Sequence, residues 1–596
     1  MDKKAEYNRW TKEALIKRIQ SLEAEKASFL HNNAAAAASS AATQLQEDPA
    51  IPDRGAAVVD DDGPAPAVKP AKKKVDRKID PSRYSTRLVA FKLAYLGKAY
   101  GGFEFQASAT LSTIEEELWK ALVRACLIFP ENPDEVRWEP WEYSKCGRTD
   151  RGVSAFGQVI GLRVRSNRPL PKKRGNPSTT VTAQEEGADA STITPSAQQE
   201  AGEEELEEEE KPFDDHTDEI QYCRILNRLL PPDIRMLAWC PDVSEGFSAR
   251  HACAERQYRY FFTQPAYSPV PNSMENPKAT APGGIKDGWL DIEAMRTAAK
   301  KYEGLHDFRN FCKVDPGKLI QNFMRRIFEC DVVEVKDAAA ALPHLQQEEF
   351  RSPHLNRDGT LTTTTEPYPK VYYFHVRGSA FLWHQIRCMV SVLFAIGQGL
   401  ESPDILDALL DPTRHPRRPN YTLASEFPLV LWDCIFPDLS ITNAPGADPA
   451  APKVDNLHWV YEGEENPLGK HGVSGLVDQL WQGWRERKMD ELLAGQLLGL
   501  VASGTSSGDI SKRLDRKAPA SMPLSQRVFE GDNRDRICGK YVPLLKRGTL
   551  PAPEETYDKE ARRKGYKDAD DWRAARAKKW EGTPRYNLPP AEEGDE

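Results

Sequence analysis

The sequence KCGRTDRGVS, residues 145–154, places a single carboxylate, Asp150, between two arginines and two glycines. A strand-like segment, residues 158–164, follows it, so the loop is expected at the edge of a sheet. An arginine a few ångströms away would stabilise the ionised acid and lower its pKa by about 1–3 units. Asp150 could then attack an electrophilic carbon. From composition alone, a turn held together by an ion pair is the simpler interpretation.

The sequence on both sides of this loop predicts an α+β protein with helices packed on a mostly antiparallel sheet. Period-two alternation, clearest in residues 89–95, predicts strands buried on one face. Further strands are predicted at 158–164, 234–243, 323–335 and 371–376. Helices are predicted after a possible capping box at Ser112 and Glu115, and at 220–230, 291–302, 381–396, 474–500 and 556–580.

A chain of 596 residues is longer than one hydrophobic core usually supports, so several structural units are expected. The predicted parts are an amphipathic helix at 1–30, a linker at 31–86, subdomains at 87–264 and 288–438, and an appendage at 439–596 with a basic helix. Low-complexity inserts interrupt the subdomains at 167–217 and 338–367. The linker's basic cluster, 72–78, fits a nuclear signal or an RNA-contacting arm, and a solvated linker equally well.

Charge and composition restrict the function classes only partly. The net charge is −9, but seven acids lie at 203–210 and three at 60–62. These runs belong to low-complexity sequence, and without them the chain is close to neutral, so net charge neither supports nor excludes RNA binding. No apolar run is long enough for a membrane span, and no secretory signal is recognisable. The nucleus and cytoplasm are therefore the expected compartments.

The residue types that bind metals and cofactors are dispersed. The ten cysteines contain no CxxC pair, and the eleven histidines contain no HExxH motif. The sequence accordingly predicts no metal site and no disulfide framework. Neither a P-loop nor a dinucleotide-binding glycine motif is present, so no small-molecule cofactor is expected.

Arginines and aromatic residues alternate in the segment RQYRYFF, which begins at Arg256. In a strand, Tyr258, Tyr260 and Phe262 share one face, while Arg259 lies on the other. Such rings can stack on an extruded base, each stack contributing roughly 1–3 kcal/mol. For Tyr260 and Phe262 a place in the core is equally compatible with the pattern. Tyr258 is the functional candidate.

A third segment, residues 378–390, is predicted to open a helix after a strand. Arg387 lies in its apolar body, and a buried cation requires a partner such as Asp150. His384 is interpreted as a core or surface histidine, because no partner for it is recognisable in the sequence.

Taken together, these segments resemble the TruA family of tRNA pseudouridine synthases. The resemblance covers about residues 87–436 and rests on five motifs in the family's order: GRTD at 147–150 with Gly152 and Val153, FSAR at 247–250, RxYRY at 256–260, YEGxxDF at 302–308 and FLWHQIR at 381–387. Ser154, where bacterial members tend to have histidine, and the FLWHQIR segment resemble the eukaryotic branch that modifies tRNA positions 38 and 39.

The resemblance implies a TruA-type fold with two subdomains around a central RNA-binding cleft. It implies that Asp150 attacks the uracil or the ribose anomeric carbon, so that the base detaches, rotates and rejoins through C5. Tyr258 would stack on the uracil, with Arg256 and Arg259 as further substrate-binding candidates. Arg387 would pair with Asp150 and hold the RNA strands apart.

Arg148 would occupy the space left by the flipped base. The implied partners are a tRNA anticodon stem-loop and a second copy of the chain, with no cofactor, because isomerisation requires none. Three alternatives stay open: a synthase acting at other tRNA or mRNA uridines, an inactive tRNA-binding or chaperone protein, and a scaffold whose N-terminal helix recruits a partner.

Overall fold

The computed structural model describes residues 80–170, 212–269, 285–336, 354–355, 361–362, 369–438, 448, 451–464, 470–472, 475–503, 526–533 and 535–579. All of them belong to one compact unit, residues 78–596. The predicted helix at 1–30, most of the linker 31–86 with its basic cluster, and the greater part of the inserts at 167–217 and 338–367 lie outside the described residues.

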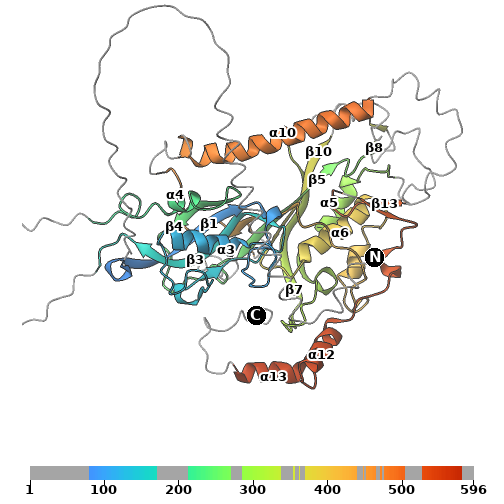
Figure 1. Ribbon diagram of the computed structural model, residues 1–596. Coiled ribbons are helices and arrows are strands. Elements are labelled where there is room, and N and C mark those ends of the chain that lie inside the picture. Colours follow the sequence, from blue (N-terminus) through green and yellow to red (C-terminus); the bar gives the residue numbers. More distant parts are fainter. Residues whose placement is uncertain are drawn as a thin grey trace, which may run out of the picture. The chain divides into compact units, whose positions relative to one another are not determined.

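A ten-stranded sheet organises the described residues (Figure 1). Its strands are β1 (Ser85–Tyr95), β2 (Ser144–Lys145), β3 (Ser154–Ser166), β4 (Ile234–Cys240), β5 (Glu255–Gln264), β6 (Gly304–Asp307), β7 (Met324–Glu334), β10 (Lys370–Gly378), β11 (Leu429–Ile435) and β12 (Val460–Tyr461). They follow the order β12-β4-β1-β3-β11-β5-β10-β7-β6, with β2 paired to β3.

The sheet consists of two halves that meet at one strand. In the first half β1 pairs antiparallel with β3 and β4, and in the second β10 pairs antiparallel with β5 and β7. β11 joins the halves, because it is parallel to β3 and antiparallel to β5. The predicted α+β fold with a mostly antiparallel sheet is confirmed.

The helices are α3 (Ile114–Arg124), α4 (Tyr222–Asn227), α5 (Ile292–Lys300), α6 (Gln385–Gly397), α7 (Ile405–Leu409), α10 (Leu476–Ser503), α12 (Pro553–Arg563) and α13 (Ala569–Lys579). Helix α5 packs against both β7 and α6, and Figure 1 shows α5 and α6 side by side. Two small strand pairs complete the list: β8 (His354–Leu355) with β9 (Leu361–Thr362), and β13 (Gln526–Val528) with β14 (Arg536–Cys538). None of the described helices combines the length and apolar character that crossing a membrane requires.

Three helix boundaries differ from the sequence prediction. Thr113, not Ser112, caps α3, with its side chain accepting from the backbone N–H of Glu116. The helix predicted from 381 begins only at Gln385, because His384 has a left-handed backbone, φ 62°. The region predicted as one helix at 556–580 contains α12 and α13, separated at Gly565, whose φ of 89° ends a helix favourably.

Each half of the sheet has its own apolar core. Phe91 of β1 and Trp119 of α3 lie in the first core, and Phe374 of β10 lies in the second. Tyr557 and Trp572, from the C-terminal helices, are also buried in the second core. Part of the predicted appendage is therefore built into the folded unit.

Candidate active site

The loop that carries Asp150 is clamped against the turn after β1. A Cβ at Gly97 would lie 2.0 Å from the carbonyl oxygen of Val153, so only glycine fits at this position. Gly102 has a φ of +119°, and a Cβ there would lie 3.1 Å from the carbonyl oxygen of Thr149. On the β3 side, the buried Gln158 amide donates to the carbonyl of Gly147 at 2.8 Å. The loop is therefore fixed on both sides of the carboxylate.

Two side chains from the turn between β10 and α6 hold the Asp150 carboxylate. Trp383 Nε1 donates a hydrogen bond to Oδ1 at 3.0 Å, and His384 Nε2 lies 3.3 Å from Oδ2. Positive φ is uncommon for a non-glycine residue, and at His384 it turns the chain into α6. The site therefore joins residues that are 233 positions apart in sequence.

The protonation states at this site differ from the sequence prediction. Burial raises the pKa of Asp150 above its ordinary value, and the opposing effects of Trp383 and Arg387 do not cancel it. The expected lowering of this pKa is thus wrong. Burial and neighbouring cations lower the pKa of His384 to about 3, so its imidazole is neutral at physiological pH. A neutral ring that contacts a carboxylate through Nε2 carries its proton on that nitrogen.

The carboxylate is surrounded by protein and yet reachable. The Asp150 side chain is 32% exposed, and that of His384 is 11% exposed. Solvent and substrate can therefore reach the carboxylate of Asp150 more easily than the imidazole of His384. The cations whose charges act on Asp150 are Arg387, Lys318 and Lys313. Lys313 Nζ also lies 4.3 Å from the centre of the Trp383 ring. An anionic ligand that approaches Asp150 meets a positive field.

Arg387 acts on the loop through a different partner from the predicted one. Its guanidinium donates to Glu426 Oε2 at 2.8 Å and to the carbonyl of Ala424 at 2.7 Å. The predicted direct pairing with Asp150 is wrong, because Glu426 is the closer acid. A Cβ on Gly152 would lie 2.8 Å from Glu426 Cγ, so Glu426 packs tightly against the Asp150 loop. Arg387 therefore supports the loop through Glu426.

Comparison with known proteins gives consistent matches. Residues 298–437 match the family model for tRNA pseudouridine synthases. The tRNA pseudouridine(38/39) synthases of Bos taurus and Homo sapiens are each 38% identical over 408 residues, which cover 68% of this chain and 63% of theirs. The tRNA pseudouridine(38/39) synthase of Saccharomyces cerevisiae is 32% identical over 440 residues, 73% of this chain and 72% of the relative.

The chain belongs to the tRNA pseudouridine synthase family. A more distant relative, the tRNA pseudouridine synthase A of Methanothrix thermoacetophila, is 28% identical over 354 residues, 59% of this chain and 84% of the relative. The match spans less than two thirds of the length of the mammalian synthases, 63%. The residues matched by the family model contain β6, β7, β10 and β11 together with Trp383, His384 and Arg387.

In this family member, β5 divides its aromatic and basic residues between two faces as predicted. Tyr260 and Phe262 are buried in the second core, which selects the core interpretation for both. Tyr258 is only partly buried and packs edge-to-face on Phe381, with ring centres 5.2 Å apart. Phe381 belongs to the turn that supplies Trp383. Tyr258 therefore keeps a position compatible with stacking on a base beside the Asp150 site.

The two arginines of β5, Arg256 and Arg259, are bound to other parts of the protein. Arg256 donates to the carbonyls of Cys146 at 3.1 Å, Arg250 at 3.0 Å and Ser379 at 2.7 Å. It thereby connects the segments that contain the GRTD, FSAR and FLWHQIR motifs, as a positioning residue. Arg259 lies on the opposite face of the sheet.

The guanidinium of Arg259 stacks 3.6 Å from the ring centre of Trp432 and 4.5 Å from that of Tyr373. Neither ring contacts Asp150. Arg148, the residue predicted to fill the space of the flipped base, forms an ion pair with Glu104 at 3.1 Å and is partly exposed. It can exchange that surface partner for RNA at little cost, since exposed ion pairs contribute about 0–1 kcal/mol.

Sequence reasoning missed Trp383 and His384 as partners of Asp150. The FLWH motif was recognised, but a contact between segments so far apart has no signature in spacing. It also missed a cluster of thiols: Cys146, Cys253 and Cys434 are buried, and their sulfur atoms all lie within 4.8 Å of one another. The prediction of no metal site rested on spacing, which does not report such convergence.

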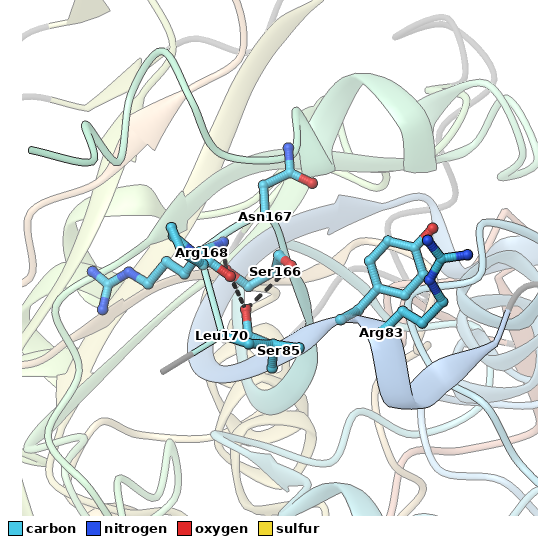
Figure 2. Close-up of a pocket in the computed structure, with 8 residues that line it drawn as sticks. Arg83, Ser85, Ser166, Asn167, Arg168 and Leu170 are labelled. Atoms are coloured by element: carbon cyan, nitrogen blue, oxygen red, sulfur yellow. Dashed lines mark hydrogen bonds between the residues drawn. The ribbon is translucent and has the colours of Figure 1, made fainter. Parts of the chain in front are cut away.

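A separate cavity of about 270 Å³ lies where β1 begins and β3 ends (Figure 2). Its lining comprises Arg83, Tyr84, Ser85, Ser166, Asn167, Arg168, Pro169 and Leu170. Ser85 Oγ donates to the carbonyls of Arg168 at 2.6 Å and Ser166 at 3.3 Å. No acid lines this cavity, and it shares no residue with the Asp150 site, so it is not the candidate active site.

Proposed function

We propose that this chain isomerises uridine to pseudouridine in tRNA, with Asp150 as the nucleophile. The observation that carries the proposal is the environment of this acid: in a chain of the tRNA pseudouridine synthase family, an accessible carboxylate is held by Trp383 and His384 with a raised pKa. A carboxylate with few donors keeps its reactivity toward carbon, because its charge is not consumed by strong pairing.

In the proposed mechanism, the target uridine leaves the RNA stack and enters the site, and Tyr258 stacks on it. Extrusion costs a few kcal/mol, which stacking and phosphate contacts offset. The Trp383 indole and the His384 imidazole aim the Asp150 carboxylate at the uracil or the anomeric carbon. The glycosidic bond from N1 breaks, the base rotates, C5 forms the new bond and the aspartate is released; C5 then loses its proton to solvent and N1 takes one up. Lys313 and Lys318 favour the approach of phosphate.

We further propose the anticodon stem-loop, at positions 38 and 39, as the site of action. The support is the similarity to the mammalian and yeast relatives, which are tRNA pseudouridine(38/39) synthases. A homodimer that shares one tRNA, and activity in nucleus and cytoplasm, are proposed by analogy with the family. Sedimentation analysis and fluorescence microscopy test these two points separately.

The direct test is conversion of an anticodon stem-loop with uridines at positions 38 and 39, comparing the wild type with Asp150→Ala at equal RNA occupancy. The proposal expects pseudouridine with the wild type alone. Conversion at other uridines would keep the reaction and overturn the positions. If neither protein converts uridine while both bind, the chain is an inactive RNA-binding member of its family.

A further inference from the structure

The thiol cluster of Cys146, Cys253 and Cys434 lies directly behind the loop that carries Asp150. Cys146 directly precedes Gly147, Cys253 lies just before β5, and Cys434 belongs to β11. All three side chains are buried, with exposures of 3%, 6% and 0%. Among the described residues, this is the group of histidines, cysteines and acids whose geometry could hold a metal ion.

The spacing of the sulfur atoms suits a thiophilic ion. Zn²⁺ binds thiolate sulfur at about 2.3 Å, which puts the sulfurs of one site roughly 3.8–4.0 Å apart in tetrahedral or trigonal arrangement. The three sulfur atoms already lie within 4.8 Å of one another, so an ion needs only a small contraction of the cluster. Thiolates prefer zinc and other soft ions over Mg²⁺ or Ca²⁺.

The cation beside the cluster gives an independent argument. Arg256 is largely enclosed, and the groups that accept its hydrogen bonds are backbone carbonyls of Cys146, Arg250, Cys253 and Ser379. In the described residues no carboxylate forms an ion pair with it. A buried cation requires a counter-charge. Arg256 donates to the backbone carbonyls of two of the three cysteines, Cys146 and Cys253, so its guanidinium lies beside the cluster.

We infer that Cys146, Cys253 and Cys434 form a structural zinc site that fixes the loop before Asp150. On binding, Zn²⁺ forms three bonds to sulfur, and the thiol protons leave to solvent. Three thiolates and one Zn²⁺ carry a net charge of −1, which the guanidinium of Arg256 balances. The ion ties together the three segments that Arg256 already connects through its carbonyl partners.

The ion's role is positional, since none of its ligands contacts Asp150. Cys146 precedes Gly147, which is hydrogen-bonded to the buried Gln158. Holding the Cys146 sulfur therefore fixes the first residue of the Asp150 loop. The other described buried cysteines, such as Cys330 of β7, belong to no such group and serve as controls.

The test is metal content, which does not depend on the proposed isomerase activity. The full-length chain is purified without chelator from zinc-supplemented cells, and zinc is measured by mass spectrometry in the wild type and in Cys253→Ser, Cys434→Ser and Cys330→Ser. We expect one equivalent in the wild type and in Cys330→Ser, and a loss of most of it in the two cluster variants. Equal zinc in all four proteins would overturn the assignment.

A second measurement on the wild type covers the case that the cluster variants do not fold. The chelator-treated protein is titrated with Cd²⁺ while the ultraviolet thiolate-to-cadmium absorption is recorded. We expect saturation at one equivalent with the intensity of three thiolates, and reversal by Zn²⁺. A protein that contains no zinc and shows no such band, or one whose peptide map shows a disulfide between two of the three cysteines, overturns the zinc site.

Discussion

Two acids in the first half of the sheet show how surroundings separate a structural carboxylate from a reactive one. Glu219 has a side chain only 1% exposed, and it accepts from Ser166 Oγ at 2.6 Å, Asn167 N at 2.8 Å and Arg87 at 3.1 Å. Burial alone would raise its pKa, but these hydrogen bonds outweigh burial and lower it. Asp150 keeps 32% exposure and yet has a raised pKa.

The comparison shows that the number of hydrogen-bond donors around a carboxyl group, more than its exposure, decides whether its pKa is raised or lowered in this fold. Glu219 is fully paired and holds the end of β3 against the segment before α4. Asp150 receives one hydrogen bond from Trp383 and a neutral imidazole contact, while the nearby guanidinium of Arg387 is bound to Glu426. Its destabilised charge is the feature expected of a site that performs chemistry.

The largest expected effect separates activity from stability at Asp150. Asp150→Asn should reduce the isomerisation rate by at least about 10⁴-fold, because the nucleophile is gone. The melting temperature should stay equal or rise, since a neutral amide avoids the cost of burying a charge. Single-turnover assays and calorimetry of the two proteins measure both. A strongly reduced melting temperature would mean that Asp150 is a structural acid.

Glu219→Gln should behave in the opposite way. Removing the charge that balances the buried Arg87 should destabilise the fold by roughly 3 kcal/mol, because Asp215 then compensates only part of the cation. Denaturant unfolding monitors this change. The rate per folded molecule should stay within about twofold. A loss of rate without a loss of stability would break the distinction between the two acids.

His384 makes stability depend on pH. Its pKa is about 3 in the folded protein and near 6.5 when unfolded, so acidification below 6.5 protonates only the unfolded state. Stability should therefore fall by roughly 2 kcal/mol between pH 7 and pH 5 in the wild type, in excess of the change in His384→Gln. Denaturant unfolding of both proteins at the two pH values provides the comparison. Parallel changes would mean that His384 is not kept neutral by the fold.

The smallest effect is expected at Arg259. Because its guanidinium stacks on Trp432 and Tyr373, on the face away from Asp150, Arg259→Ala should lose about 1 kcal/mol of stability. The isomerisation rate should change by less than about threefold. RNA-binding titrations and the rate together show whether the residue contacts substrate. A large increase in KM would restore its predicted role in substrate binding.

Much of the fold was predictable because its signals are local. Alternation in β1 and β5 correctly predicted which residues share a face, but for Tyr260 and Phe262 it left open whether that face lies in the core or contacts a base. The start of α6 was mispredicted, because the residues around His384 in the sequence do not indicate its left-handed backbone conformation. The prediction of a single helix at 556–580 was wrong, because Gly565 has a left-handed backbone conformation that ends α12 before α13 begins.

The site was predictable only where a contiguous motif carried it. Asp150 could be singled out from its own loop, and Tyr258 from its strand. The hydrogen bond from Trp383, the ion pair of Arg387 with Glu426 and the convergence of Cys146 with Cys434 arise from pairing of distant strands. Charge and burial in a one-dimensional pattern cannot choose among several possible acid partners for one arginine.

The most direct test of the central claim is the pH dependence of the single-turnover rate in Trp383→Phe, with Trp432→Phe on the opposite face as the matched control. Without the indole donor, the pKa of Asp150 should rise further, so the acid limb should shift upward by about 1 pH unit and the rate should recover at higher pH. The Trp432→Phe limb should coincide with the wild type. An unshifted limb in Trp383→Phe, or a rate lowered equally at every pH, would contradict the claim that the Asp150 carboxylate performs the reaction under the control of these donors.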